Sequence, residues 1–361
     1  MEEEGGLTMK QGKLKRLCVK LAASAIPCST WRRDFRNYFL KSSHPIYGRI
    51  YPPIYEMSAR INGLPPELYN RNGERMEVFF IRDRHSALDP YGLPSPSRFL
   101  WDHYNIALDT HFYTHNQMLE RMGSPSRCYG MLTESEGIVP EDYNIFRKHK
   151  GLESDFTAIF TYSEKVLNEV SNAKFLPSCA TVWYGTERGG GTLDDRAFER
   201  KTRNISIVSS AKCMCELHAF RITAARLCRS EGLADAFGTF DGGKMVKIAD
   251  TLAEYRYSIA IENFVSPYFF TEKITNCFAA MTVPIYLGSS RIGDYFNEDG
   301  IIRLSPKDDI RKVISQCGAR DYESRIEAIK DNYKRALAYR NIYDMMYDKY
   351  LRGASKAGAS H

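Results

Sequence analysis

The chain has 361 residues, of which 43% are hydrophobic and 12% are aromatic, so it is long enough for two domains with packed cores. It contains no run of about 18 apolar residues, which excludes a typical transmembrane helix, and its acidic start, MEEEGG, predicts no secretory signal. The nine cysteines are scattered without a C-x-x-C pair, so we expect reduced thiols and a cytoplasmic location.

The net charge of +6 is concentrated near the amino-terminal end. Residues 10–41 carry +8 and the rest of the chain −2. In a helix, the apolar residues of this leader share one stripe, namely Leu14, Leu17, Cys18, Leu21 and Ala25. Such a basic amphipathic helix predicts either an anionic membrane surface as partner, hence a peripheral position on the cytosolic face, or packing against the body of the protein. No nucleic-acid recognition motif accompanies the charges, so we expect no nucleic-acid partner.

The first half of the chain predicts irregular structure followed by strands. Residues 42–75 are rich in proline, tyrosine and glycine and predict a linker. The segment MEVFFIRD, residues 76–83, predicts the first strand, and a helix is expected near residues 99–107. Residues 127–135 predict a strand that ends in acidic residues, and strand and helix then alternate through residues 155–170.

A glycine-rich stretch, TERGGGTLDDR at residues 186–196, predicts the main internal boundary. We therefore divide the chain into a basic leader (1–41), an amino-terminal Rossmann-like domain (42–190), a carboxy-terminal Rossmann-like domain (191–320), and terminal helices with a tail (321–361).

Beyond residue 196, strands and helices alternate regularly. The expected strands are residues 204–210, 233–240, 257–263, 283–288 and 301–304, and the expected helices are residues 216–229, 245–255 and 271–281. This alternation predicts the α/β class with a parallel sheet, and the two halves predict two Rossmann-like domains facing a cleft. Ligands of such sheets bind at the carboxyl ends of strands, beside helix N-termini.

Five polar residues flank one loop at such a place. Glu262 and Asn263 end an apolar strand, and Thr271, Glu272 and Lys273 begin the next helix, with Thr271 as the expected N-cap. The exposed amides of a helix start favour a phosphate, Lys273 adds a cation, and a carboxylate can accept hydrogen bonds from sugar hydroxyls. Ordinary helix capping explains Thr271 and Glu272 alone but not the whole set.

The stretch of residues 255–297 resembles the donor-binding motif of glycosyltransferase family 10, the α-1,3/1,4-fucosyltransferases, in its bacterial or viral type. The shared residues are Glu262-Asn263, Thr271-Glu272-Lys273, and Val283-Pro284-Ile285 with Gly288. The resemblance, clear over about residues 204–305, implies a GT-B fold and an inverting transfer from a nucleotide sugar, usually GDP-fucose. It implies an oligosaccharide or glycolipid acceptor, such as lipopolysaccharide or another surface glycan. It also implies that the amino-terminal Rossmann-like domain binds the acceptor and the carboxy-terminal one the donor. It also implies no metal and no cofactor, which agrees with the absence of a D-x-D motif.

The resemblance implies further donor contacts from Lys212, His218 and Arg221 and from the aromatic pair Tyr268 and Phe269. In the better-known fucosyltransferases, an arginine aligns with Leu217 and a tyrosine with Phe269. Arg221, one helical turn beyond Leu217, is the expected replacement for that arginine. These two departures leave another nucleotide sugar open as the donor.

Inverting transfer needs a general base that takes a proton from the acceptor hydroxyl. The resemblance implies a glutamate after a strand of the first half, and the sequence offers Glu134 and Glu136, of which Glu134 matches the family pattern better. A non-catalytic relative that binds a nucleotide or a glycan is the remaining alternative; it predicts that neither glutamate matters.

Overall fold

The computed structural model describes residues 18–19, 21–27, 35, 76–83, 96–102, 108–177 and 179–352. The chain divides into two compact units. Unit 1 comprises Met1–Leu132, Glu141–Thr161 and Val166–Lys174, and unit 2 comprises Thr133–Pro140, Tyr162–Lys165 and Phe175–His361. All lysines and arginines of the leader, and the predicted linker at residues 42–75, lie outside the described residues.

The described part of the leader is helical at residues 18–19 and 21–24. Val19 and Ala23 are buried, whereas Leu21 is 64% exposed. The three described members of the expected stripe, Cys18, Leu21 and Ala25, are exposed; Leu14 and Leu17 lie outside the described residues.

Unit 1 is built on a six-stranded sheet with the order β2-β1-β3-β4-β5-β6, in which β1 to β5 pair in parallel. Its strands are β1 Glu77–Arg82, β2 Phe99–Asp102, β3 Thr110–Thr114, β4 Arg127–Leu132, β5 Ala158–Thr161 and β6 Ala173–Phe175. Its helical segments are η1 His115–Glu120, η2 Asp142–Asn144, α4 Ile145–Lys148, η3 Leu152–Asp155 and α5 Glu164–Glu169, which begins in unit 2.

The prediction of a helix starting at Phe99 is wrong. Residues 99–102 form β2, which pairs with β1 in parallel, and the ring of Phe99 packs 4.8 Å from that of Phe79. A short run of apolar and aromatic residues fits a helix or a strand equally well by its own pattern, so the neighbouring strand decides.

Unit 2 contains a five-stranded parallel sheet with the order β11-β10-β9-β7-β8. Its strands are β7 Arg203–Val208, β8 Asp235–Phe237, β9 Tyr255–Ile261, β10 Val283–Leu287 and β11 Ile302–Arg303. Its α-helices are α6 Glu216–Ser230, α7 Ile248–Leu252, α8 Glu272–Ala279, α9 Ile310–Ile314, α10 Ala319–Ser324, α11 Ile326–Ala336 and α12 Ile342–Met346. Shorter helical segments are η4 Ala197–Arg200, η5 Phe240–Gly242, η6 Ile292–Asp294, η7 Glu298–Gly300, η8 Leu337–Tyr339 and the π-helix η9 Tyr347–Leu351. The predicted α/β class, with parallel sheets in both halves and helices at the carboxy-terminal end, is confirmed.

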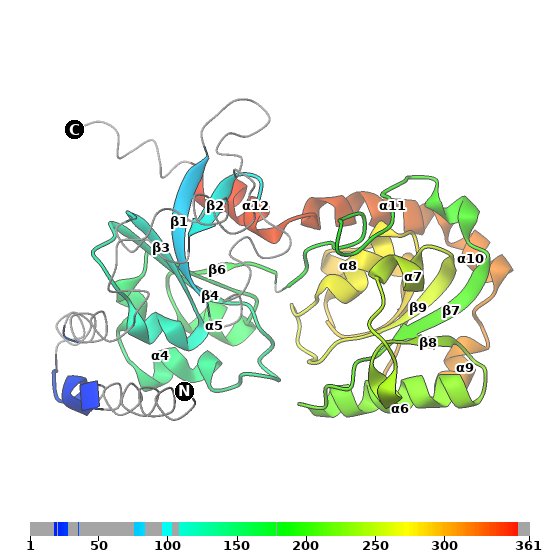
Figure 1. Ribbon diagram of the computed structural model, residues 1–361, viewed down its shortest axis with the longest axis horizontal. Coiled ribbons are helices and arrows are strands. Elements are labelled where there is room, and N and C mark those ends of the chain that lie inside the picture. The colour runs from blue at the N-terminus through cyan, green and yellow to red at the C-terminus, as the bar shows by residue number, and fades with distance from the viewer. Residues whose placement is uncertain are drawn as a thin grey trace, which may run out of the picture. The chain divides into compact units, whose positions relative to one another are not determined.

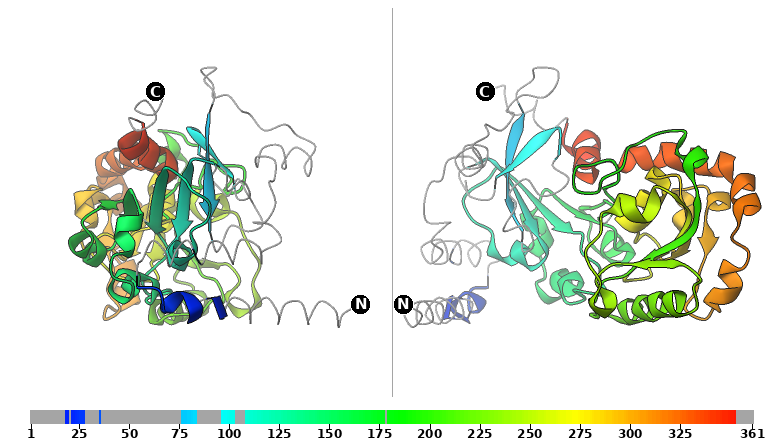
Figure 2. Two further views of the ribbon diagram at one scale, coloured as in Figure 1. Left: turned by 90° about the vertical axis from the view of Figure 1, so that its left-hand side faces the viewer. Right: turned by 45° about the vertical axis from the view of Figure 1, so that its right-hand side comes forward.

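Helices cover both faces of the unit 2 sheet, with α6 on one side and α7 and α8 on the other (Figures 1 and 2). Successive residues of β9 point to opposite faces. Ile259 belongs to the same buried cluster as Ala225 of α6, whereas Ala260 packs in the cluster of Ile274 and Phe278 of α8. This double burial fixes the register of β9 and brings its carboxyl end to the sheet edge where α8 starts.

The glycine-rich stretch at residues 186–196 lies inside unit 2, because the chain enters that unit at Phe175. Gly190 and Gly191 have positive φ angles of 67° and 81°, which favour glycine. The Gly190 carbonyl accepts a hydrogen bond from the Gly185 amide (2.8 Å), and the Gly190 amide donates to the Thr186 carbonyl (2.7 Å). The three-glycine run is thus part of a closed turn within the unit.

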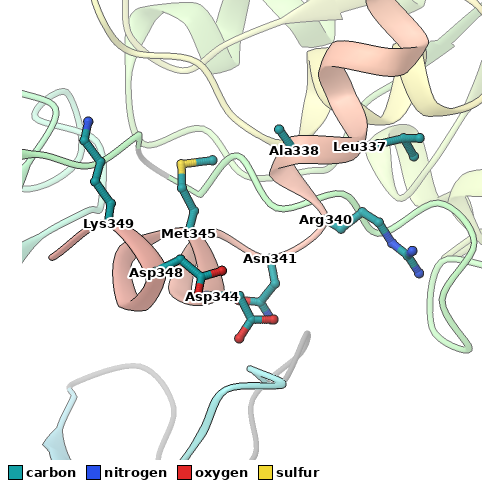
Figure 3. Close-up of a pocket in the computed structure, with 8 residues that line it drawn as sticks. All are labelled: Leu337, Ala338, Arg340, Asn341, Asp344, Met345, Asp348 and Lys349. Atoms are coloured by element: carbon teal, nitrogen blue, oxygen red, sulfur yellow. The ribbon is translucent and has the colours of Figure 1, made fainter. Parts of the chain in front are cut away.

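A few hydrogen bonds join the terminal helices to the rest of unit 2. The amide of Ile342 donates to the Thr181 hydroxyl (3.2 Å), and the Tyr350 hydroxyl donates to the Phe175 carbonyl (2.8 Å). A cavity of about 510 Å³ opens along these helices (Figure 3). It is lined by Leu337, Ala338, Arg340, Asn341, Asp344, Met345, Asp348 and Lys349. Among the described residues, no helix has the length and apolar character needed to cross a membrane.

A buried lysine connects three segments of unit 2. Lys201 is 5% exposed, and its Nζ lies 2.9 Å from the Leu252 carbonyl, 2.6 Å from the Ala280 carbonyl and 3.0 Å from the Thr282 hydroxyl oxygen. It also donates to the Ala253 carbonyl at 3.1 Å. Burial lowers the pKa of Lys201 to about 7.

We expect Lys201→Met to lower the free energy of unfolding by roughly 3 kcal/mol, because it leaves buried carbonyls without a donor. The unfolded chain binds more protons than the folded chain between pH 7 and the ordinary lysine pKa, so the wild type gains stability relative to the variant as pH rises. In urea unfolding, the difference in the free energy of unfolding between the wild type and Lys201→Met should be about 2 kcal/mol larger at pH 9 than at pH 7. The exposed Lys244→Met is the control; an equal loss at both pH values would contradict the lowered pKa.

Candidate functional site

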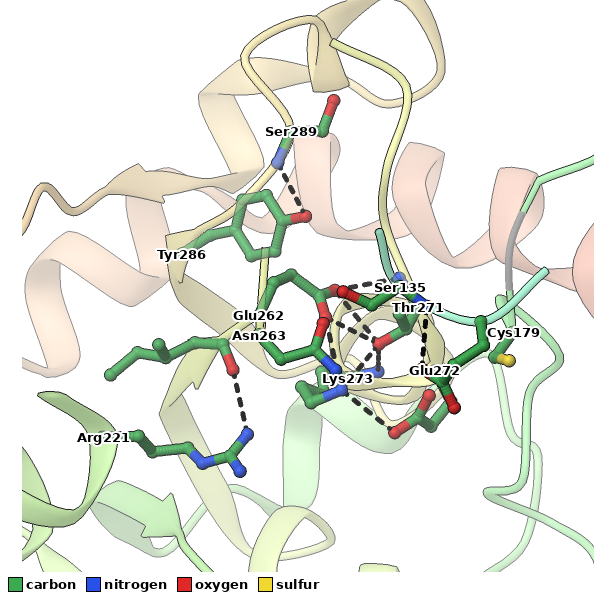
Figure 4. Close-up of polar contacts among 12 residues, drawn as sticks. Ser135, Cys179, Arg221, Glu262, Asn263, Thr271, Glu272, Lys273, Tyr286 and Ser289 are labelled. Carbon is green, nitrogen blue, oxygen red and sulfur yellow. Dashed lines mark hydrogen bonds and ion pairs between the residues drawn. The ribbon is translucent and has the colours of Figure 1, made fainter. Parts of the chain in front are cut away.

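The carboxyl end of β9 and the start of α8 form one hydrogen-bonded assembly within unit 2 (Figure 4). Glu262, the residue after β9, stays in register because its amide donates to the Leu287 carbonyl of β10 (2.8 Å). Thr271 is the N-cap of α8, and its hydroxyl accepts from the Lys273 amide (3.3 Å). The predicted cap is confirmed.

The Glu262 carboxylate is the buried centre of this assembly. It is 0% exposed and accepts hydrogen bonds from the Thr271 amide (2.8 Å) and the Thr271 hydroxyl (2.8 Å). The Nζ of Lys273 lies 3.2 Å from its Oε2 atom. Burial raises the pKa of Glu262, and the charge of Lys273 opposes this. Glu262 therefore ties the strand end to the helix start and holds Lys273 in place.

Lys273 is the cation of this assembly, and its side chain reaches solvent. Its side chain is 25% exposed, and its Nζ donates to the Thr271 hydroxyl oxygen (2.9 Å) and lies 3.3 Å from Glu272 Oε1. Burial works to lower the pKa of Lys273, but the carboxylates of Glu262 and Glu272 outweigh it, so the pKa is raised. Lys273 remains a cation at neutral pH.

The start of α8 does not offer free amides to a ligand. The amide of Thr271 donates to Glu262, and that of Glu272 donates to the Cys179 carbonyl (2.8 Å). The Lys273 and Ile274 amides donate to the hydroxyl and carbonyl of Thr271. The expectation that exposed amides here hold a phosphate is wrong, because the loop and the N-cap already use them. Anion binding at this position falls to side chains.

Arg221 brings a second cation to the same place from α6. It is 8% exposed, and its Nη1 donates to the Ile261 carbonyl (3.2 Å) at the end of β9 (Figure 4). Its buried Nε has no hydrogen-bond partner among the described residues. Burial lowers the pKa of Arg221, while Glu262 and Glu272 oppose this. A buried guanidinium N–H without an acceptor indicates a place for an external one.

Arg221, Glu272 and Lys273 lie at one cavity of about 220 Å³ inside unit 2. The remaining lining residues are mostly apolar and come from β7, α7, β9 and α8: Val208, Ser210, Ile248, Thr251, Leu252, Ser258, Ile259, Ala260, Ile261, Asn276 and Cys277. The cavity thus combines an apolar wall with two cations and one carboxylate. It suits a ligand with a flat apolar group joined to an anion.

His218 of α6 and Lys212, which precedes α6, lie close enough to Arg221 and Lys273 to interact with them electrostatically. His218 is 5% exposed, and its Nδ1 accepts from the Met214 amide (3.2 Å), so the neutral ring carries its proton on Nε2. Burial lowers the pKa of His218, as do the charges of Arg221, Lys273 and Lys212, whereas Glu134 opposes them. Lys212 itself is exposed. Four of the predicted donor-binding side chains are therefore close enough to interact electrostatically: Lys212, His218, Arg221 and Lys273.

The aromatic pair of the loop does not line this cavity. Phe269 is 1% exposed, and its ring packs 4.8 Å from that of Tyr162 and 6.0 Å from that of Phe264. The Tyr268 hydroxyl accepts from Arg291 Nη1 (2.7 Å), which turns it toward the protein surface. Leu217, where the family places an arginine, packs against the core of unit 2.

Asn263 contributes its backbone to the loop. Its carbonyl accepts from the Cys215 thiol (3.2 Å), while its side-chain Oδ1 is buried and has no partner among the described residues. The sequence reasoning missed Asn276, whose Oδ1 accepts from the Trp183 and Tyr184 amides (2.8 and 2.9 Å) at the cavity wall. A buried amide on the apolar face of a helix is the signal that could have shown it.

Glu134 and Glu136 belong to a segment, Thr133–Pro140, that packs with unit 2. Between them, Ser135 is 0% exposed and lies beside Thr271 (Figure 4). One carboxylate oxygen of Glu134 accepts from the Ser135 amide (2.8 Å), and the Glu136 amide donates to the Tyr162 hydroxyl (2.7 Å). Glu134 is the one of the two glutamates that acts on the pKa of His218.

No three His, Cys, Asp or Glu side chains of the described residues gather where they could hold a metal ion. Of the nine cysteines, the eight that the structure describes are free thiols.

A family model and several solved structures are similar to the chain. Residues 199–344, which include β7 to η8, the first part of α12 and all the residues that line the cavity, match the model described as "Glycosyltransferase family 10 (fucosyltransferase) C-term". No curated protein matches significantly. Among solved structures, the chain is similar to an alpha1,3-fucosyltransferase with GDP (TM-score 0.47, 12% identity, covering 81% of this chain and 96% of that chain). It is also similar to an alpha1,3-fucosyltransferase with GDP-fucose (TM-score 0.43, 12% identity, covering 81% and 96%). The part of the chain from residue 199 to residue 344 is therefore similar to the carboxy-terminal domain of the fucosyltransferases of glycosyltransferase family 10.

Proposed function

We propose that the protein transfers fucose from GDP-fucose to a hydroxyl of an oligosaccharide or glycolipid acceptor, with inversion and without a metal ion. The observation that carries the proposal is the buried Nε of Arg221, which lies with Lys273 at a mostly apolar cavity. A nucleoside diphosphate has the matching chemistry, because its base is flat and its diphosphate is anionic. The similarity of residues 199–344 to the fucosyltransferase model supports fucose as the sugar.

In the proposed reaction, the bond between the sugar C1 and the β-phosphate oxygen breaks, and its electron pair leaves with GDP. The acceptor oxygen forms the new bond to C1 from the opposite side, and its proton passes to a carboxylate, for which we propose Glu134. Arg221 and Lys273 would stabilise the negative charge that develops on the departing diphosphate, which is the task that a metal ion performs in other transferases. Lys212 would add to the same field.

Glu134 is preferred to Glu136 as the base because of electrostatics and packing. Its carboxylate raises the pKa of His218, which lies near Arg221 and Lys273, and one of its oxygens accepts a hydrogen bond from the Ser135 amide. Glu136 instead uses its amide to bind Tyr162. A proton acceptor must lie near the reacting groups, and the position of Glu134 meets this requirement better.

A panel of nucleotide sugars tests the proposal. Purified protein is incubated with GDP-fucose, GDP-mannose, UDP-glucose and dTDP-rhamnose, with and without EDTA, and nucleotide release is measured with an oligosaccharide acceptor present. We expect turnover of GDP-fucose that EDTA leaves unchanged. Turnover of a different donor alone would reject GDP-fucose and favour the second candidate, which the departures at Leu217 and Phe269 support. Nucleotide binding without turnover of any donor would favour a non-catalytic relative.

We further propose that the leader, residues 10–41, binds an anionic membrane surface and keeps the enzyme near a lipid-linked acceptor. Its charge of +8 and the exposure of Leu21, at 64%, support this. We expect full-length protein to sediment with vesicles that contain phosphatidylglycerol and a variant without residues 1–41 to stay in solution. Unchanged sedimentation of the shortened variant would contradict the proposal, and neutral vesicles are the control.

A further inference from the structure

We infer that Tyr162 is a positioning residue that holds the Glu134-Ser135-Glu136 turn in place for proton transfer, an inference that rests on the proposed function. Tyr162 follows β5 and is 0% exposed. Its hydroxyl accepts from the Glu136 amide at 2.7 Å and lies 3.5 Å from the Glu134 carbonyl, to which it donates. One buried hydroxyl thus bridges the two backbone groups on either side of Ser135.

The rest of the turn is held by its own hydrogen bonds. The Ser135 hydroxyl accepts from the Gly137 amide (3.1 Å), and the Ser135 carbonyl accepts from the amides of Ile138 (2.9 Å) and Val139 (3.0 Å). Of the hydrogen bonds named so far, those to Tyr162 are the ones that connect the turn to another part of unit 2. Together with the contact of the Cys179 thiol with the Thr133 carbonyl (3.9 Å), they hold the turn that carries Glu134 within unit 2.

The ring of Tyr162 is fixed from the other side by the loop between β9 and α8. Phe269 packs against it at 4.8 Å and 52°, and Phe264 supports Phe269 at 6.0 Å. The same loop touches the turn directly: a Cβ on Gly137 would lie 3.2 Å from the Asn263 carbonyl. Tyr162 therefore joins the turn that carries the proposed base to the loop that carries Glu262, Thr271 and Lys273.

This arrangement also gives a reason for the phenylalanine at position 269. Its ring is buried against Tyr162, so a hydroxyl on this ring would need a partner inside the packed contact. The hydroxyl that the turn requires comes from Tyr162 instead. A displacement of about 1 Å in a reacting group costs on the order of 10²-fold in rate, so loss of the bridge should appear in catalysis.

Tyr162→Phe tests the inference, with Tyr113→Phe as the matched control. Tyr113 is also fully buried and hydrogen bonded to backbone, through the amide and carbonyl of Met122, but it lies in unit 1. We expect Tyr162→Phe to lower kcat at least 10-fold, to leave the KM for GDP-fucose and the Kd for GDP within twofold, and to shift the acidic limb of the kcat profile against pH. Hydrogen exchange of the Glu136 amide should become at least 10-fold faster, and Tyr113→Phe should change none of these.

Each readout decides a different point. An unchanged exchange rate of the Glu136 amide would overturn the bridge, whether or not the protein turns over GDP-fucose. Faster exchange with kcat and pH profile unchanged would overturn the positioning role. If the wild type turns over no donor, the proposed function fails and the catalytic role of Tyr162 fails with it, while the exchange measurement still reports on the bridge.

Discussion

Replacement of Glu134 by glutamine is expected to lower kcat for fucosyl transfer by about 10³-fold, because glutamine cannot accept the proton of the acceptor hydroxyl. The amide oxygen of glutamine can still accept the hydrogen bond from the Ser135 amide, so the turn should keep its structure. The Kd for GDP, measured by calorimetry, should stay within twofold. Loss of rate with retained binding separates chemistry from donor recognition.

Glu136→Gln is the matched control for this variant, because it lies two residues away on the same turn and binds Tyr162 through its amide rather than its side chain. We expect its kcat to fall no more than about threefold, well below the usual effect of losing a general base. The reverse outcome, a large loss for Glu136→Gln and a small one for Glu134→Gln, would exchange the roles of the two residues. Small losses in both would place the base elsewhere in the chain.

Replacement of Lys273 by methionine is expected to have two separable effects. The Kd for GDP should rise about 10²-fold, because a cation at the diphosphate is lost. The free energy of unfolding should fall by about 3 kcal/mol, because the Glu262 carboxylate, 0% exposed and 3.2 Å from Nζ in the wild type, would remain buried without its cation.

The double variant Glu262→Gln, Lys273→Met separates these effects. It removes the uncompensated carboxylate, so most of the stability should return, whereas the affinity for GDP should stay low. Recovery of affinity together with stability would mean that Lys273 only supports the fold. Lys212→Met, which removes an exposed cation, should weaken GDP binding less and leave stability unchanged.

The ion pair of Glu262 and Lys273 also predicts how the stability of Lys273→Met depends on pH. The charge of Lys273 opposes burial at Glu262 more strongly than the hydrogen bonds from Thr271 do, so without Lys273 the pKa of Glu262 should rise further above its unfolded value. A carboxyl group with a raised pKa in the folded state contributes stability below its unfolded pKa and loses it as pH rises through the folded pKa. The stability deficit of Lys273→Met should therefore shrink as pH falls from 7 to 5, as urea unfolding would show.

The local pattern of the sequence determined the two elements that hold the site, β9 and α8. A nearly continuous run of buried residues defines β9, and the helical pattern after Thr271 defines α8, so the strand end just before Glu262 and the N-cap at Thr271 follow from neighbouring residues. The spacing of the charged residues also indicated that Glu262 and Lys273 belong to one site. These features are local, and for that reason one stretch of sequence is enough to predict them.

Only the tertiary structure decided which groups of the site face a ligand. The amides at the start of α8 are taken by Glu262, the Cys179 carbonyl and Thr271, and Cys179 lies 93 positions from Glu272 in the sequence. Arg221 is set toward the cavity by the Ile261 carbonyl, a contact across 40 positions. Hydrogen bonds and packing between distant segments leave no periodic trace in a single sequence. The same reason explains why Phe269 pairs with Tyr162, and why Glu134 comes to lie with unit 2 although it follows a strand of unit 1.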